Sequence, residues 1–440
     1  MKSILTLALI LFATLLNAQE SIPISLENVL KLGGANNLTI KEFQERQNLA
    51  AAHAAKAKEW WLPEFYAGAQ THQYWGAAMN GNGNFFLDVN RNNLWLGLGL
   101  KANWNFAEGI YAAKAAKFRN RASVHRTEAE KNKTLLKSIT IYYELMSAQL
   151  NFIAYSNLVK QADTIAQQIQ IQVEAGKRYE SEMLLAKSNR NHLKLEMLNA
   201  QKMYRQASAE LLKQLNLAQS IKLVSVDSSL MPLDYTLELT SISEELYKNR
   251  GEIKAKELEI KSLQIQKKNF TTGLLIPQLS IGANTSYFGK LNDNVDPMDP
   301  IRYTSPDQLY PTSTINASLL WQIPLGAFIY KGDSKKYSSL IRLKKIETEQ
   351  LKAFINEEIT RASIQVKTGK QQIEIAKEAL KLSSEALKQS IERQQFGTAK
   401  PFEVFQTQQF YIQSQIDYLK VVSEFNTAQF TLKVAKGETL

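Results

Sequence analysis

The sequence contains no cysteine, and only four of its 440 residues are histidine. A protein without cysteine forms no disulfides and cannot carry a lipid on an N-terminal cysteine after export. The sequence also lacks a phosphate-binding glycine loop and a close pair of histidines, so we expect neither an enzyme nor a cofactor or metal site. The histidines are scattered at His53, His72, His125 and His192.

Long hydrophobic runs are also missing, apart from one near the N-terminus. Lys2 precedes an apolar run from Ile4 to Leu16, and the small residue Ala18 follows it closely. The run is too short to span a membrane as a helix, and its pattern is typical of a secretory signal peptide. We therefore expect residues 1–18 to be a signal peptide and the mature chain to be exported.

Charge is not gathered into one patch, although the formal net charge is +11. Lysine and arginine are interleaved with glutamate and glutamine along the expected helices, as between Glu357 and Arg361. Such interleaving is typical of a solvated helical surface. Nucleic acid is therefore not an expected partner.

The residues from Leu94 to Asn103 alternate between apolar side chains and polar or small ones. Strict period-2 alternation predicts a strand with one oily face, and about ten residues are enough for a tilted strand to cross a bilayer. Three more stretches show the same pattern, at 65–72, 278–287 and 314–323. A single such strand would also suit a soluble sandwich, but four strands in two separated pairs favour a membrane sheet.

Four strands cannot close a membrane barrel, because the smallest such barrels have about eight. An open sheet edge in hydrocarbon would leave backbone amides unpaired, at several kcal/mol each. If these strands cross a membrane, several copies of the chain must contribute to one barrel.

Long helices are expected between and after the strands. Residues 107–173 contain no proline, and their apolar residues recur at steps of four and three, which is the coiled-coil seam. Gly176 ends this stretch, and a second helix is expected at 181–215. In the second half, a helix at 334–395 ends before Gly397, and a last helix follows at 402–436. The seam comprises Ile141, Leu145, Ala148, Phe152, Tyr155, Val159, Ala162, Ala166, Ile169 and Val173.

Shorter features complete the chain. Ser25 is expected to cap a first helix, and helices are expected at 40–58 and 242–269. Trp60 and Trp61 precede the first strand, where they suit either the interfacial girdle of a membrane sheet or an ordinary core. We expect loops at 76–93, which is rich in glycine and asparagine, and at 290–311.

The two halves of the chain repeat one another. Adding 221 to residue numbers carries Gly176 onto Gly397, Leu195 onto Ile416 and Leu211 onto Leu432. This offset indicates an internal tandem duplication. We therefore divide the chain into a signal peptide (1–18), a first repeat of helix, two strands and long helical hairpin (19–216), an equatorial linker (217–240) and a second repeat (241–440). Small residues in the second copy of the seam, such as Gly369, predict closer helix packing there.

With this repeat, the sequence resembles the TolC-type outer membrane efflux protein family. The resemblance rests on LPEF and IPQL before strands and on two segments after the long helices, VEAGKRYESEML and RQQFGTAKPFEVF. It implies an α+β membrane protein: a homotrimer whose protomers each give four strands to one 12-stranded outer-membrane β-barrel. It further implies that the long helices continue this barrel as a coiled-coil tunnel across the periplasm.

The resemblance also implies a function and its residues. The function is the outer membrane exit duct of a tripartite efflux pump, which works with a periplasmic adaptor and an inner-membrane transporter and sits in outer membrane lipid. A periplasmic gate is expected at Glu403, Gln406 and Glu182, with Gln406 at a position where family members often have a second acidic residue. Adaptor docking is expected at the two hairpin tips, formed by Gly176, Lys177, Tyr179, Phe396, Gly397 and Lys400.

Two alternatives remain open at this point. A duct of a type I protein secretion system would have the same architecture, and the sequence does not name the pump. A soluble periplasmic coiled-coil scaffold with a β-domain would also satisfy the heptads. For Glu403, the alternative to a gate is simple support of the last helix through its macrodipole.

Overall fold

The computed structural model describes residues 21–79, 81–233, 244–290 and 309–440. The expected signal peptide and most of the expected 290–311 loop lie outside these residues. The chain forms two compact units, and each unit draws on separate stretches of sequence. The first contains the described parts of Met1–Gln47, Ser123–Ala255 and Glu347–Leu440, and the second contains those of Asn48–Ala122 and Lys256–Ile346.

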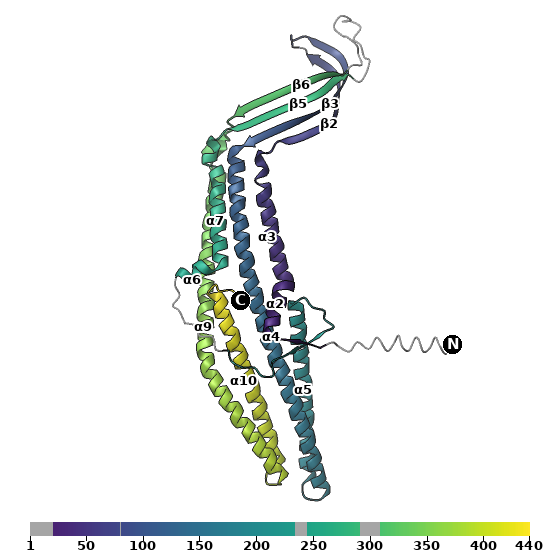
Figure 1. Cartoon of the computed structure of the whole chain (residues 1–440), viewed down its shortest axis with the longest axis vertical. Helices are drawn as coiled ribbons and strands as arrows, with labels where there is room; N and C mark the ends of the chain where they lie inside the picture. Colours follow the sequence, from purple (N-terminus) through teal and green to yellow (C-terminus); the bar gives the residue numbers. More distant parts are fainter. Residues whose placement is uncertain (1–20, 80, 234–243, 291–308) are drawn as a thin grey trace, which may run out of the picture. The chain divides into compact units, whose positions relative to one another are not determined.

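The second unit holds a four-stranded antiparallel sheet in the order β2-β3-β5-β6 (Figure 1). Its register places Leu98 opposite Ala67 and Thr285, and Ala283 opposite Leu100 and Ile315. Because directly opposed residues point to the same face, the four apolar stripes form one continuous oily face, as the alternation predicts. The strands are β2 (Glu64–Met79), β3 (Phe85–Asn105), β5 (Gln278–Lys290) and β6 (Tyr310–Leu320).

The prediction of a loop at 76–93 is wrong, because most of these residues belong to β2 and β3. The β2–β3 pairing continues through Trp75 and Asn90, shifts register between Gly76 and Ala78, and ends where Met79 pairs with Phe85. This part of β3 is polar and does not alternate, so periodicity gave no signal there. Backbone hydrogen bonding to the partner strand forms it instead. The last strand also differs from expectation, since β6 ends at Leu320 rather than at residue 323.

The tryptophans before β2 have two different roles. Trp60 packs its ring edge-on against Phe106, with centroids 5.8 Å apart. A Cβ on Gly109 would lie 2.1 Å from the Trp60 ring, so only glycine permits this contact. Trp61 is 57% exposed, and its carbonyl accepts a hydrogen bond from Trp104 Nε1 at 2.7 Å. Trp60 is thus a packing residue, whereas Trp61 is available for an interface.

Helices and short 3-10 turns connect the strands. Their bounds are α3 (Leu38–Lys56), η1 (Glu59–Trp61), α4 (Phe106–Glu174), α7 (Gly251–Asn269), η2 (Thr272–Leu275), α8 (Leu325–Ile329) and α9 (Gly332–Gln395). Within the second unit, Ser262 Oγ donates to the Ala115 carbonyl at 3.0 Å and Lys344 pairs with Glu259 at 3.2 Å. No helix among the described residues is long and apolar enough to span a membrane.

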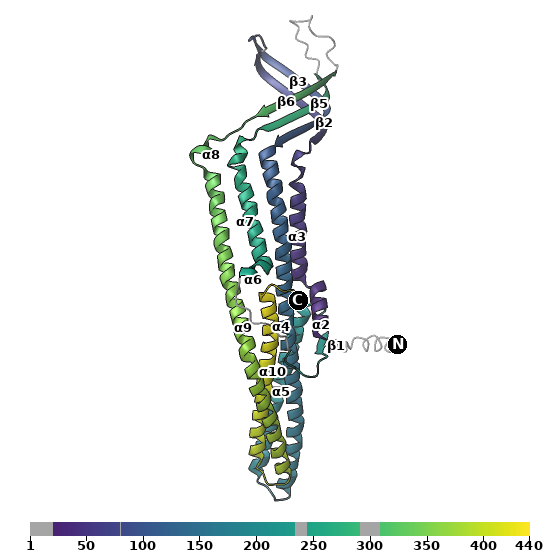
Figure 2. The ribbon, with the colours of Figure 1, turned by 60° about the vertical axis from the view of Figure 1, so that its left-hand side comes forward.

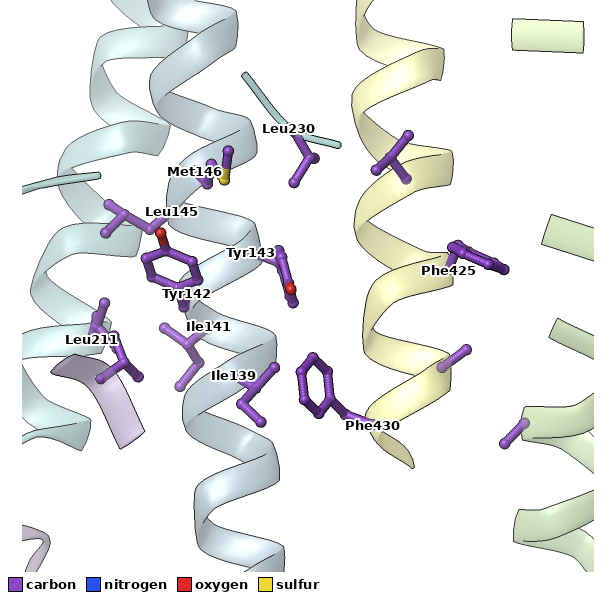
Figure 3. Packing of buried hydrophobic residues seen from close by; sticks show 14 of the residues in the cluster. Ile139, Ile141, Tyr142, Tyr143, Leu145, Met146, Leu211, Leu230, Phe425 and Phe430 are labelled. Carbon is purple, nitrogen blue, oxygen red and sulfur yellow. The ribbon is translucent and has the colours of Figure 1, made fainter. Parts of the chain in front are cut away.

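The first unit packs two long helical hairpins, one from α4 and α5 (Glu180–Gln214) and one from α9 and α10 (Pro401–Ala435). Six of the ten predicted seam residues are buried, with Leu145 and Ile169 fully inaccessible, and the other four are partly buried. Figure 3 shows Ile139, Tyr142 and Leu145 of α4 in this core, with Leu211 of α5 and Phe430 of α10 close by. The long helices follow the expected bounds within two residues, and Ser25 caps α2 (Leu26–Asn36) as expected.

The parallel strands β1 (Ser21–Ile24) and β4 (Lys222–Ser225) form a small sheet in the first unit. Tyr204 of α5 donates its hydroxyl to the Leu223 carbonyl at 2.7 Å, and burial raises the pKa of this tyrosine to about 12. In the second hairpin, a Cβ on Gly369 of α9 would lie 2.9 Å from the Phe425 ring of α10. The backbone at this position therefore lies close to the neighbouring helix, as a small residue allows, while the comparison with the first seam stays a prediction.

The single helix expected at 242–269 is instead two helices, α6 (Glu244–Asn249) and α7, separated by Arg250. The Arg250 side chain is only 6% exposed. It makes two hydrogen bonds to Glu252, one to Glu358 at 3.2 Å and one to the Val434 carbonyl at 3.1 Å. The break thus places a cation among partners from α7, α9 and α10, which a local pattern cannot foresee.

We expect Arg250→Met to lower the free energy of unfolding by about 2–4 kcal/mol, because it leaves two carboxylates and a carbonyl without their buried partner. Arg46→Met is the control, since Arg46 forms an exposed ion pair with Glu42 and should change stability by less than about 1 kcal/mol. Thermal unfolding followed by circular dichroism compares the two variants. Equal losses would show that Arg250 contributes no more than a surface pair.

Candidate functional site

The turns at the ends of the two hairpins have the same backbone geometry. Gly176 has φ +70° and Gly397 has φ +74°, in the left-handed region that favours glycine. After each glycine the chain bonds back to the helix, with Lys177 N–H to the Gln172 carbonyl at 2.8 Å and Thr398 N–H to the Arg393 carbonyl at 2.9 Å. This is the hydrogen bond of a Schellman-type helix end, so the two predicted helix breaks are confirmed as one motif used twice.

The returning helices also begin alike. Tyr179 and Lys400 are the N-cap residues, both extended with ψ 147° and both without a side-chain cap. Glu182 N–H bonds to the Tyr179 carbonyl at 3.0 Å, and Glu403 N–H bonds to the Lys400 carbonyl at the same distance. A carboxylate in the first turn stabilises the positive end of the helix dipole, so this supporting role is open to both glutamates.

An apolar cluster joins the two hairpins toward their tips. Leu158 and Ile169 of α4 and Val404 of α10 are almost completely buried in it, and Leu387 of α9 and Leu193 of α5 belong to the same cluster. Side-chain packing therefore holds the two hairpins of this chain together toward their tips.

Two polar contacts cross between the hairpins. Arg178 has a side chain only 10% exposed, and its Nη2 donates to the Ala399 carbonyl at 3.4 Å. Farther from the tips along α5 and α10, Asn189 Nδ2 donates to Gln408 Oε1 at 3.0 Å. Neither contact was expected from the sequence. Arg178 does lie within the quoted tip segment, but its burial and its partner Ala399 are set by the second hairpin and leave no signal in the local sequence.

The three expected gate residues lie in different surroundings. Glu182 pairs with Arg178 at 3.3 Å, and Glu403 pairs with Arg393 at 3.3 Å. The Glu403–Arg393 pair is about half exposed on both sides, and Gln406 is exposed. Each glutamate is thus paired with an arginine of its own hairpin, and these arginines are polar tip residues that sequence reasoning missed.

The expected docking residues lie on the surface of this chain. Tyr179 is 80% exposed and Phe396 is 84% exposed. Lys177 and Lys400 are exposed beside them, one on each tip. Large aromatic side chains at such exposure, next to a cation, are typical of residues that anchor a protein contact.

A groove of about 740 Å³ lies between the hairpins, away from the tips. Its lining carries four glutamates, Glu144, Glu196, Glu210 and Glu424, and one lysine, Lys420. Burial raises the pKa of Glu144, and the neighbouring Glu210 carboxylate raises it further. This part of the helical unit is therefore acidic, in contrast to the positive net charge of the chain.

Three solved structures show what the fold resembles. The Campylobacter jejuni CmeC outer membrane channel is 16% identical with a TM-score of 0.78, and the match covers 94% of this chain and 85% of that one. VceC, an outer membrane protein of Vibrio cholerae, is 14% identical with a TM-score of 0.72, covering 94% and 96%. The Neisseria gonorrhoeae MtrE outer membrane channel in its open state is 13% identical with a TM-score of 0.72, covering 94% and 89%.

The chain therefore has the fold of the TolC-type outer membrane channels, as its sequence motifs suggest. Each of these matches covers 94% of this chain. No protein-family model matches the chain, and no curated protein sequence matches it.

We expect Arg178→Gln to loosen the tips, because the Ala399 carbonyl and Glu182 both lose a charged donor. A loss of about 1.4 kcal/mol would make amide exchange about tenfold faster in peptides covering 172–184 and 393–404. Hydrogen–deuterium exchange with mass spectrometry measures this. Arg393→Gln removes an exposed pair within one hairpin and should change the rate less than about twofold. If both variants accelerate exchange equally, Arg178 has no special role between the hairpins.

Proposed function

We propose that this protein is the outer membrane exit duct of a tripartite efflux pump, passively conducting small molecules from an inner-membrane transporter. The observation that carries the proposal is the continuous oily face of the four-stranded sheet, whose exposed side chains include Leu96, Leu98 and Leu100. A soluble scaffold would have to cover such a face with its own residues. The likeness in fold to outer membrane channels supports the same conclusion.

Closure of the sheet requires other copies of the chain. β2 and β6 are its outermost strands, and in hydrocarbon their outer amides need partners. Three copies would supply twelve strands, with β6 of one copy beside β2 of the next. The homotrimeric barrel is therefore the simplest assembly that satisfies the backbone, and it agrees with what the family resemblance implies.

We further propose that the architecture arose by tandem duplication. α5 and α10 each have 35 residues, and their bounds differ by 221 at both ends. α3 and α7 each have 19 residues, and both lead through a 3-10 turn into a strand. The paired turns at Gly176 and Gly397 support the same relation.

In the proposed trimer the helical hairpins form the periplasmic conduit, and their tips face the pump. The exposed residues Tyr179 and Phe396 would contact the adaptor, with Lys177 and Lys400 beside them. Gly176 and Gly397 shape these tips. Three copies of Glu403 around one axis would form an acidic ring with Glu182 and Gln406 close by, and a ring of carboxylates favours cations.

We expect Leu98→Arg to prevent stable insertion, because an arginine facing lipid near the midplane of a barrel costs about 2–4 kcal/mol per copy. Asn284→Arg is the matched control, since Asn284 lies on the opposite face of the sheet and pairs with Gly99. Outer membrane fractionation and heat-resistant oligomers on gels compare the variants. If the Leu98→Arg protein fractionates normally, this face does not meet lipid.

If the wild-type protein itself remains soluble after lysis and never forms such oligomers, the duct is excluded and the scaffold is favoured. Normal fractionation of the Leu98→Arg variant would therefore contradict only the lipid-facing side of the sheet. A soluble wild-type protein would contradict the duct itself.

We expect Glu403→Gln to lower the cation-to-anion permeability ratio by roughly twofold, because it removes one negative charge per protomer from the ring. Gln406→Glu, about one helical turn away, should raise the ratio. Reversal potentials in planar bilayers under a salt gradient measure both. If neither substitution moves the ratio, the macrodipole is the remaining role for Glu403.

A further inference from the structure

The passage from the sheet into the long helix differs between the two halves of the chain. In the first half, β3 ends at Asn105 and α4 begins at the next residue. In the second half, β6 ends at Leu320 and α9 begins only at Gly332, and the short helix α8 lies between them. Figure 2 shows α8 at the corner where β6 passes into α9.

The segment Trp321–Lys331 exposes large apolar side chains in unusual density. Five of its eleven residues are large, apolar or aromatic and between 52% and 75% exposed, namely Trp321, Leu325, Phe328, Ile329 and Tyr330. Leu325, Phe328 and Ile329 are spaced i, i+3 and i+4, so they share one side of α8. A contiguous exposed patch of this kind marks a binding surface.

The opposite side of α8 is not packed tightly against the rest of the second unit. A cavity of about 610 Å³ lies there, lined by residues that include Asn105, Phe270, Gln322 and Asp333. α8 is therefore held mainly by its chain connections. Its apolar side contributes nothing to the core of this unit.

The surroundings of the patch indicate what covers it. Trp321 directly follows the end of β6 and is 59% exposed, close in sequence to the half-exposed Leu319 of the oily face. Lys331, Lys335 and Lys336 follow the patch and are exposed. Tryptophan and tyrosine beside an apolar helix, with lysines at its end, are typical of an interfacial anchor. The core of a protein interface, in contrast, is depleted of lysine.

We propose that Trp321–Lys331 is an interfacial anchor that lies in the periplasmic leaflet of the outer membrane. α8 buries Leu325, Phe328 and Ile329 among acyl chains, and the three lysines contact the phosphates of anionic phospholipids. This inference rests on the proposed function, because the sheet must span the bilayer for its foot to lie at that leaflet. Beyond the duct, the anchor predicts that the protein prefers anionic phospholipids. It also predicts that α8 of each copy helps to fix how deeply the sheet sits in the bilayer.

The absence of cysteine makes a site-specific test possible. Single-cysteine variants Ile329→Cys, Leu98→Cys and Leu343→Cys are labelled with an environment-sensitive fluorophore and reconstituted into liposomes. Quenching by brominated lipid reports contact with acyl chains, and quenching by iodide reports contact with water. Leu98 tests the sheet, and Leu343 is a half-exposed control on α9.

The anchor predicts that the probe at residue 329 is quenched by brominated lipid, like the probe at 98, while the probe at 343 is quenched by iodide. Lipid quenching at 98 but not at 329 overturns the anchor and leaves the duct standing. A probe at 329 shielded from both quenchers also overturns it, because a second copy of the chain then covers α8. Absence of lipid quenching at both 98 and 329 overturns the duct itself.

The lysines are tested in the Ile329→Cys background. Lipid quenching should be about twofold stronger in liposomes containing phosphatidylglycerol than in neutral phosphatidylcholine, because each lysine near the surface is attracted to the negative leaflet. The combined Lys331→Gln, Lys335→Gln and Lys336→Gln substitutions should abolish this difference. Equal quenching in both lipids before substitution overturns the assignment of an anionic headgroup.

Discussion

In the proposed membrane setting, the structure depends on one requirement, that every backbone amide in hydrocarbon be hydrogen-bonded. Within one chain, neighbouring strands of the four-stranded sheet pair their backbone hydrogen-bonding groups. The register of these pairings puts all four apolar stripes on one face. The same requirement leaves the outer sides of β2 and β6 to be paired by other copies. In the proposed duct, assembly is thus part of the folding problem, because the four strands of one chain cannot close a barrel by themselves.

In the helical unit, apolar packing between helices is the main interaction. Apolar seams bury one side of each long helix, and the two hairpins share a core toward their tips. Such packing alone would hold the tips firmly together. The polar contacts made by Arg178 and Asn189 cross the same boundary, and contacts of this kind can be exchanged for others without exposing apolar surface. A gate built here would therefore combine a fixed core with replaceable hydrogen bonds.

The two halves of the chain use one plan but differ where each touches its surroundings. The turns at Gly176 and Gly397 are nearly identical in backbone geometry, whereas the foot of the sheet differs between β3 and β6. In the first half, Trp60 fills the space above Gly109, and the strand passes directly into α4. In the second half, α8 interrupts this passage and exposes apolar residues. Under the proposed tandem duplication, the shared turns are retained from the ancestral half, and the two strand-to-helix passages have diverged.

The sequence by itself determined the strands near Leu98, the long helices and their glycine breaks, because periodicity and turn chemistry depend on neighbouring residues. It also suggested the fold through short tip motifs. Only the tertiary structure decided that residues 85–93 are strand, that Arg250 interrupts a helix and that Arg178 meets Ala399. Each of these depends on partners far away in the chain, and the choice among many polar partners is made only when the elements pack together.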